Sequence, residues 1–265
     1  MIDAFAFVIL SLLYVITPLI FSIQSTELFE FPKMLSLYAG AALLLPLCIY
    51  KVYINRQNVK LLLASPMRGG LRWGFLILTS FFLFLLSQAL STIFSIDRST
   101  SFFGYYTRFN GGFLSLLTYT ILFVSTLLFV SKDKVHLLLK IIVGGGVLVA
   151  LWGLPSHFGN DLICKVARGT FDTSCWTKDF IPTERMFSTL GQPNWFATYL
   201  LVLIFIVLYT YTTGYSLLNK NYERIERFIQ PLLFLLFSIE LVWTKSRSGI
   251  YSGIVFIGLY FLTYA

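Results

Sequence analysis

Three arginines are the residues of this sequence best suited to bind a phosphorylated ligand: Arg108, Arg185 and Arg247. Each lies next to a long apolar run, where a charged side chain is costly and usually serves a function. The arginine guanidinium also forms two parallel hydrogen bonds with phosphate oxygens. If the three lie on one side of a membrane, they predict a site for a phosphorylated ligand that is carried in that membrane.

The residues that follow Arg185 add to this prediction. Pro193 suits the first turn of a helix that runs into the next apolar stretch. The free N–H groups and the dipole at a helix N-terminus attract anions, and Asn194 offers its side-chain amide at the same place. We therefore expect Arg185 and Asn194 to bind substrate together.

The other two arginines lie in segments that allow two interpretations each. Arg247 belongs to the turn 244–249, Thr-Lys-Ser-Arg-Ser-Gly, which holds two cations and three hydroxyls. We expect an oxyanion site that includes Ser246, but a turn that only extends charged side chains to the interface has the same composition. Arg108 lies in the glycine-containing loop 95–112, which fits either a third phosphate contact or an ordinary turn with a tyrosine anchor.

Other candidate groups are fewer. Glu240 precedes Arg247 by seven residues, on about the same helical face. We interpret it as a structural ion-pair partner of one arginine; the alternative is a site for a coupling proton or ion. Neither His136 nor His157 belongs to a catalytic motif, so the sequence leaves the catalytic base unknown.

Two cysteines, Cys164 and Cys175, share the predicted loop 156–193. If this loop faces an oxidising compartment, they can form a disulfide. A metal site is not expected, because no second cysteine pair or nearby histidine completes a set of ligands.

The elements that position these residues are predicted to be membrane helices. The 265 residues are 57% hydrophobic and only 12% charged, whereas about 25% charged is usual for a globular domain. The apolar runs are continuous, and about 20 apolar residues cross a bilayer as a helix. We expect an all-α, polytopic bundle in one domain, 1–265. Its eight spans are predicted at 4–22, 34–54, 73–95, 113–131, 137–155, 194–213, 230–244 and 250–265.

The basic residues orient this bundle. With the N-terminus in the cytoplasm, the inner loops hold eleven of the twenty lysines and arginines. This orientation places all three candidate arginines outside, and it explains the net charge of +8 without a nucleic acid partner. The glycines 144–146 predict close helix packing rather than a phosphate loop. The last span covers only about 24 Å, so we expect the chain to end within it.

Four segments together resemble the O-antigen ligase family, which includes O-antigen polymerases and protein O-oligosaccharyltransferases. They are Phe-Glu-Phe-Pro-Lys at 29–33, the Gly104…Arg108…Gly112 turn, the Arg185…Gly191-Gln-Pro-Asn194 segment and the turn 244–249. The resemblance rests on their order, spacing and shared predicted side, and it extends over most of the chain.

The resemblance implies a membrane glycosyltransferase of the GT-C type, without metal or other cofactor. Such an enzyme moves a glycan from undecaprenyl diphosphate to an acceptor hydroxyl at the outer face of the cytoplasmic membrane, a step of lipopolysaccharide or other cell-envelope biosynthesis. Arg185 and Arg247 would hold the diphosphate, with Arg108 as a third contact. The family's base is a histidine in a large outer loop after the eighth span, so we expect it beyond residue 265. The acceptor would be a lipid A core, a second glycan or a protein.

The main alternative is a transporter or channel for a small anion, with Glu240 and the arginines along its pathway. Many transporters contain pseudo-symmetric halves with broken helices. This sequence shows no such internal symmetry.

Overall fold

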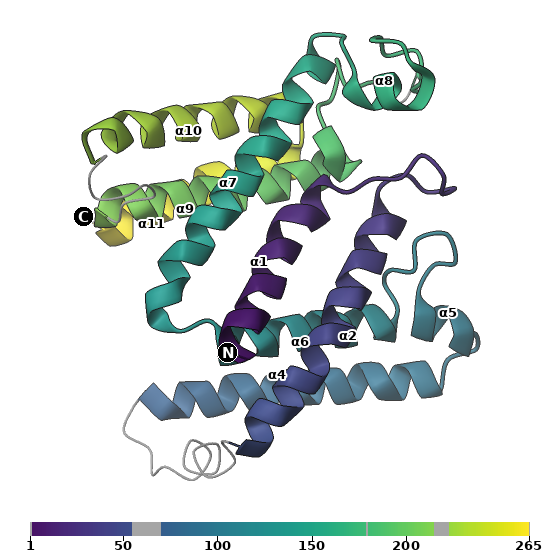
Figure 1. The fold of residues 1–265 in the computed structure, drawn as a ribbon, viewed down its shortest axis with the longest axis vertical. Helices are drawn as coiled ribbons and strands as arrows, with labels where there is room; N and C mark the ends of the chain where they lie inside the picture. The colour runs from purple at the N-terminus through teal and green to yellow at the C-terminus, as the bar shows by residue number, and fades with distance from the viewer. Residues whose placement is uncertain (1, 55–69, 179, 215–222, 265) are drawn as a thin grey trace. The chain divides into compact units, whose positions relative to one another are not determined.

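The computed structural model describes residues 2–54, 70–178, 180–214 and 223–264. Within these residues all regular structure is helical (Figure 1). Four of the basic residues used to orient the chain lie outside the described residues: Arg56, Lys60, Arg68 and Lys220.

Each predicted span falls on one helix. The helices are α1 (Ile2–Leu19), α2 (Glu30–Ile54), α4 (Gly70–Ile93), α6 (Phe113–Phe129), α7 (Lys132–His157), α9 (Pro193–Thr213), α10 (Glu223–Trp243) and α11 (Arg247–Tyr264). Short helices that the sequence did not predict lie in the connecting loops: α5 (Arg98–Phe103), α8 (Leu162–Arg168) and the 3₁₀ turn η1 (Ser188–Leu190).

The helices α1, α2, α7 and α9 are long and apolar enough to cross a membrane. Three further apolar stretches are shorter: 79–93, 113–129 and 228–243. The all-helical prediction is therefore confirmed for the described residues, and the length and apolar composition of these four helices favour a membrane protein. The number of spans and the orientation of the N-terminus stay predictions.

The described residues group into two compact units, and each is described by itself. Unit 1 contains residues 1–10 and 34–130, and unit 2 contains residues 11–33 and 131–265. The prediction of one transmembrane domain stays a prediction.

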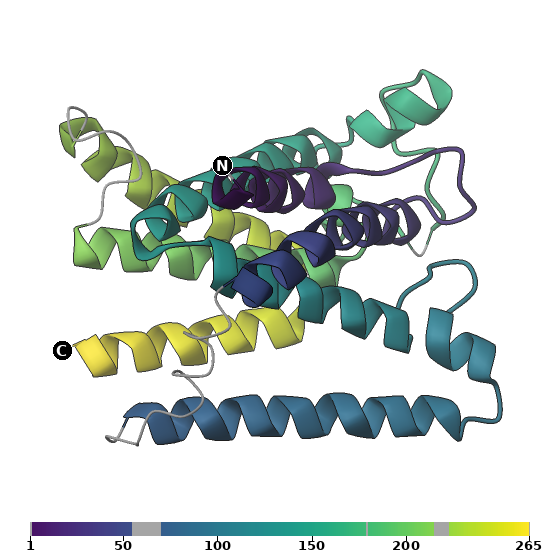
Figure 2. The same ribbon diagram turned by 60° about the horizontal axis from the view of Figure 1, so that its bottom comes forward.

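In unit 1, the short helix α5 packs against the end of α4 and the start of α6 (Figure 2). Asp97 begins α5, because its carboxylate accepts hydrogen bonds from the Thr100 amide at 3.1 Å and from the Thr100 hydroxyl. The side chain of Lys51 in α2 pairs with Asp3 at 2.7 Å. The Cys48 thiol lies 3.1 Å from the Ser125 hydroxyl, so α2 also contacts α6.

In unit 2, α9 is the central helix and packs against α7, α10 and α11. Its buried residues Phe196, Leu200, Leu203 and Val207 follow one another at steps of three or four, the spacing of one helical face. The predicted packing role of the α7 glycines has a physical basis here. A Cβ on Gly146 would lie 2.4 Å from the Leu203 side chain, and one on Gly145 would lie 3.4 Å from Val15 of α1.

Candidate functional site

Arg185 is held between the start of α9 and the turn that joins α10 to α11. Its Nε donates to the Thr244 carbonyl at 3.3 Å, and its Nη2 donates to the Asn194 side-chain oxygen at 3.4 Å. These bonds use two of the five N–H groups of the guanidinium. The other three have no partner among the described residues, and the side chain is exposed. Arg185 is therefore oriented and still able to bind an anion.

The segment 186–191, directly after Arg185, is mostly buried and forms hydrogen bonds with three other elements. The Met186 amide donates to the Trp243 carbonyl at 3.0 Å, at the end of α10. The Ser188 hydroxyl donates to the Val149 carbonyl of α7 at 2.6 Å, and the Thr189 hydroxyl donates to the Pro18 carbonyl of α1 at 2.8 Å. Hydrogen bonds from buried side chains to carbonyls fix this segment, and with it the position of Arg185.

Two glycines allow this segment to lie so close to its neighbours. A Cβ on Gly153 of α7 would stand 2.6 Å from the Met186 side chain and 2.9 Å from the Ser188 Cβ. Gly191 has a φ of +79° and faces the ring of Phe29, which a Cβ would meet at 2.4 Å. Glycine is required at position 191 for its conformation and at both positions for space.

Lys33, from the motif at 29–33, supports the same segment. Its ammonium group donates to the Thr189 carbonyl at 2.8 Å and to the Ile20 carbonyl after α1. One side chain thus connects the end of α1, the start of α2 and the segment 186–191. The motif lies wholly within unit 2, and its Lys33 helps to position the site.

The turn 244–246 is organised by its own hydroxyls. The Thr244 hydroxyl donates to the Leu241 carbonyl at 2.7 Å and accepts from the Ser246 amide at 3.1 Å. The Ser246 oxygen accepts from the Gly249 amide at 3.3 Å, and so caps α11. Thr244 and Ser246 are buried, with exposed fractions of 0% and 1%. The geometry therefore gives Ser246 a capping role, and its predicted contact with substrate stays a prediction.

Arg247 is the first residue of α11 and is exposed. Its guanidinium forms no hydrogen bond or ion pair with any residue that the structure describes. Arg185 donates to Thr244, so its side chain contacts the turn that contains Arg247. Arg185 also contacts the first turn of α9 through Asn194, and Gln192, the N-cap residue, makes no side-chain cap there. The unused donors of Arg185 and the uncapped start of α9 are groups that can bind an anion; a contact of Arg247 with the same anion stays a prediction.

A pocket of about 130 Å³ lies beside Arg185. It is lined by Arg185, Asn194 and Gln192, with Phe180 and Phe187 as apolar walls. The lining also includes the exposed carboxylate Glu184, which the sequence analysis did not single out. Its only sequence signal is its place directly before Arg185.

The ion pair predicted for Glu240 does not form in the described part of the chain. The side chain is 0% exposed, and neither carboxylate oxygen has a hydrogen-bond partner there. Arg185 lies in the loop before η1 and Arg247 begins α11, and both are exposed, whereas Glu240 is buried within unit 2. The seven-residue spacing from Arg247 does not bring the charges together, because a turn separates α10 from α11.

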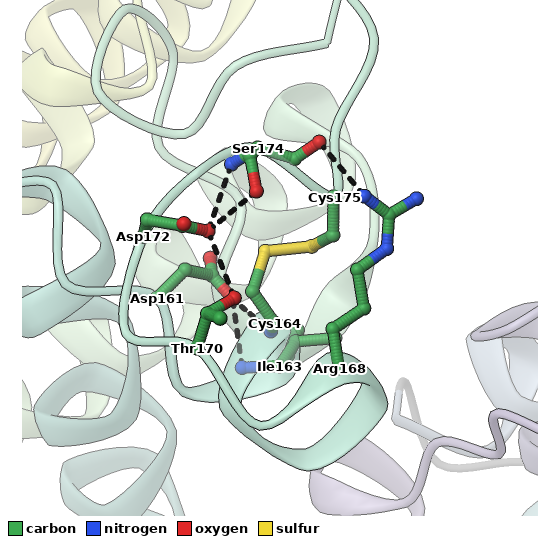
Figure 3. The surroundings of a disulfide bond; sticks show 8 residues. All are labelled: Asp161, Ile163, Cys164, Arg168, Thr170, Asp172, Ser174 and Cys175. Carbon is green, nitrogen blue, oxygen red and sulfur yellow. Dashed lines mark hydrogen bonds between the residues drawn. A yellow bond between two sulfur atoms is a disulfide. The ribbon is translucent and has the colours of Figure 1, made fainter.

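The loop between α7 and η1 is closed by a disulfide between Cys164 and Cys175, whose Cα atoms are 5.6 Å apart (Figure 3). Asp161 caps α8 by accepting from the Ile163 amide at 2.7 Å and the Cys164 amide at 2.8 Å. Asp161 and the two sulfurs also lie close enough together to suggest a metal site. The disulfide and the helix cap already use these groups, so we assign them a structural role.

Asp172 organises the other side of this loop (Figure 3). The Ser174 hydroxyl donates to its carboxylate at 2.7 Å and the Ser174 amide at 3.1 Å. These bonds, with a smaller contribution from Arg168, lower the pKa of Asp172 below its usual value. Asp97 in the α4–α5 connection behaves similarly, since the hydroxyl and amide of Thr100 lower its pKa.

Aromatic side chains pack this loop against the rest of unit 2. Trp176 stacks on Phe29 with ring centres 6.0 Å apart and meets Phe187 edge to face at 5.1 Å. His157, at the end of α7, stacks on Trp243 at 4.3 Å, and its buried Nδ1 has no partner among the described residues. His157 therefore lies near the end of α10, and stacking explains its position without a catalytic role.

Arg108 belongs to unit 1, whereas Arg185 and Arg247 belong to unit 2. Its amide donates to the Tyr105 carbonyl at 2.9 Å within a tight turn, and its side chain is exposed. The structure brings Arg185, Asn194 and the Arg247 turn together. A site shared by all three arginines stays a prediction.

Comparison with models of known protein families, with characterised proteins and with solved structures gives no significant match. The argument for function therefore depends on the site geometry and on the motifs in the sequence.

Proposed function

We propose that this protein is a multi-pass membrane glycosyltransferase that resembles the O-antigen ligases. It transfers a glycan from undecaprenyl diphosphate to an acceptor hydroxyl at the outer face of the cytoplasmic membrane. In this proposal the chain forms about eight spans of a GT-C-type bundle, with its N-terminus in the cytoplasm. The acceptor is a lipid A core, another lipid-linked glycan or a protein.

The observation that carries the proposal is the restraint of Arg185. Two neutral acceptors, the Thr244 carbonyl and the Asn194 side chain, orient the guanidinium without neutralising it. An arginine held only for stability would be expected to pair with a carboxylate. This one keeps its charge and three donors available next to the uncapped start of α9, as a diphosphate site requires.

The chemistry of the proposed step follows from this arrangement. The acceptor oxygen attacks the anomeric carbon of the glycan, and the bond from that carbon to the diphosphate oxygen breaks. Undecaprenyl diphosphate leaves with the bonding electron pair, so its negative charge increases in the transition state. Arg185 and Arg247 stabilise that charge. The proton of the acceptor hydroxyl passes to a base, a role that we assign to none of the described residues.

The test is glycan transfer by the purified protein in vesicles that contain an undecaprenyl-diphosphate-linked glycan. Loss of one such charge-stabilising donor costs about 10²–10³ in rate, so we expect this loss for Arg185→Ala and for Arg247→Ala. Lys245→Ala is the matched control, because it removes an exposed cation from the same turn. Transfer at the wild-type rate by both arginine variants would remove the basis of the proposal.

One observation favours the transporter alternative, namely the buried Glu240 without a partner. A carboxyl group in such a place can exchange a coupling proton. Flux of phosphate into vesicles that is lost in Glu240→Gln, together with an absence of glycan transfer, would establish this second function. Glycan transfer that persists in Glu240→Gln would exclude it as the main activity.

A further inference from the structure

Unit 1 contains a larger pocket that the proposed diphosphate site does not use. Its volume is about 360 Å³, within the range of about 300–1,000 Å³ typical of small-molecule sites. The end of α4, the helix α5 and the start of α6 form its walls together with residues 110–112. This is the loop that the sequence analysis singled out because of Arg108.

The lining of this pocket is polar but carries no charge. Its polar side chains are two amides and several hydroxyls, and no lysine, arginine, histidine, aspartate or glutamate belongs to it. Arg108 is not part of the lining, although Asn110 is. Phe84 and Phe113 add apolar surface. The loop thus contributes neutral groups to this pocket, and the phosphate contact expected of Arg108 stays a separate prediction.

Several of these groups are oriented by the protein and keep further hydrogen-bonding capacity. The Ser115 hydroxyl donates to the Gly112 carbonyl at 2.7 Å, and the Thr92 hydroxyl donates to the Gln88 carbonyl at 2.8 Å. Each of these oxygens can still accept a hydrogen bond. The Gln88 amide and the Ser91 hydroxyl make no hydrogen bond within the described part of the chain. Both side chains are exposed, so their donors and acceptors are accessible to a ligand in the pocket.

The loop wall is rigid. Gly104 has a φ of +86°, and a Cβ on it would lie 2.2 Å from the Asn110 carbonyl oxygen. A Cβ on Gly112 would lie 2.2 Å from the Gly104 nitrogen. The Tyr105 amide donates to the same Asn110 carbonyl at 3.1 Å. The wall is therefore formed before a ligand binds, which lowers the entropic cost of binding.

We propose that this pocket binds a neutral saccharide unit. Sugar hydroxyls both donate and accept hydrogen bonds, and so they match amides and hydroxyls such as Gln88 and Ser91. The C–H faces of a sugar ring pack against the apolar surface of Phe84 and Phe113. The inference that the ligand is a saccharide rests on the pocket lining alone. The inference that this saccharide belongs to the lipid-linked donor or to the acceptor rests on the proposed function.

The test is saturation-transfer NMR with the whole chain in phosphatidylcholine nanodiscs. Detergents with sugar headgroups are avoided because they would compete for the pocket. The probes are methyl glucopyranoside, methyl galactopyranoside and N-acetylglucosamine, with inorganic phosphate as the anion probe. We expect signals from at least one sugar. Loss of one amide or hydroxyl partner should weaken binding about tenfold in Gln88→Leu, and less in Ser91→Ala.

Ser87→Ala is the matched control, because Ser87 is on the same helix but outside the lining; its binding should equal that of the wild type. The melting temperature of each variant separates lost binding from lost folding, and Ser91→Ala provides the milder change. The absence of any sugar signal, or sugar signals unchanged in both variants, would overturn the proposal. Phosphate binding that Gln88→Leu alters would overturn it in favour of an anion site.

Two outcomes separate this inference from the proposed function. Sugar binding that persists in Arg185→Ala while glycan transfer is absent from the wild type would support the pocket and refute the transferase. If transfer occurs, its kinetics identify the source of the saccharide. A raised KM for the lipid-linked donor in Gln88→Leu indicates the donor glycan, and a raised KM for the acceptor indicates the acceptor glycan. Normal values for both would contradict a role of the pocket in transfer.

Discussion

Replacement of Gly153 by alanine should disturb the segment that positions Arg185. The new Cβ would lie 2.6 Å from the Met186 side chain and 2.9 Å from the Ser188 Cβ. The methionine end can move aside, but the Ser188 Cβ is part of a segment fixed by the hydrogen bond to Val149. The segment must shift, and Arg185 must shift with it.

The magnitude follows from a comparison within the same helix. Overpacking a buried position costs about 1–3 kcal/mol, while Gly→Ala in a helix interior gains about 1 kcal/mol. A Cβ on Gly144 would have nothing within 4 Å, so Gly144→Ala shows the gain alone. Both variants gain the same helix propensity from alanine, so the difference between them is the cost of overpacking. Gly153→Ala should therefore be less stable than Gly144→Ala by about 1–3 kcal/mol.

Two assays separate stability from positioning. Stability is measured as the free energy or midpoint of thermal unfolding in nanodiscs. The positioning of Arg185 is measured as the affinity for undecaprenyl diphosphate. Gly146→Ala is the control for positioning, because its Cβ would meet Leu203 and no part of the segment 186–191. We expect Gly153→Ala to bind undecaprenyl diphosphate more weakly than the wild type, and Gly146→Ala to bind it equally well. Equal stability of Gly153→Ala and Gly144→Ala would refute the packing argument, and equal affinity would refute the link to Arg185.

Three further predictions concern the surroundings of the site. Lys33→Met removes a hydrogen-bond donor from two carbonyls and should lower the free energy of unfolding by about 1–3 kcal/mol, measured by denaturant titration. Cys164→Ser should lower it by about 2–4 kcal/mol through loss of the disulfide with Cys175, and limited proteolysis should then cut the loop faster. Because the pKa of Asp172 is lower in the folded protein than in the unfolded chain, its ionised carboxylate stabilises the loop above about pH 4. This stabilisation is lost as the pH falls through the folded-state pKa. The Ser174 amide of the wild type should therefore lose protection from hydrogen exchange in acid. In Asp172→Asn the same amide should already lack this protection at neutral pH.

The helices could be predicted from the sequence because continuous apolar runs specify them locally. The short helices α5 and α8 could not, since they depend on the single caps Asp97 and Asp161 within polar loops. The link from Lys33 to Thr189 joins residues 156 positions apart, and no local pattern predicts it.

The candidate site was predictable in part. An arginine before a proline-initiated helix predicts an anion site, and in the structure Arg185 donates to Asn194 in the first turn of that helix. The hydroxyls of the turn 244–249 were ambiguous, because a helix cap and an oxyanion site use the same residue types. The position of Glu240 depended on the turn after α10, which changes the direction of the chain before Arg247. The neutral pocket of unit 1 had no signal, because its lining comes from three separate elements.

The most direct test of the central claim is the binding of the diphosphate group itself. Native mass spectrometry of the protein with undecaprenyl diphosphate and with undecaprenol compares ligands that differ only in that group. We predict that the diphosphate binds more tightly, and that the Arg185→Ala/Arg247→Ala double variant loses this preference by at least about tenfold, as Lys245→Ala does not. Equal binding of both lipids by the wild type, or an unchanged preference in the double variant, would contradict the account.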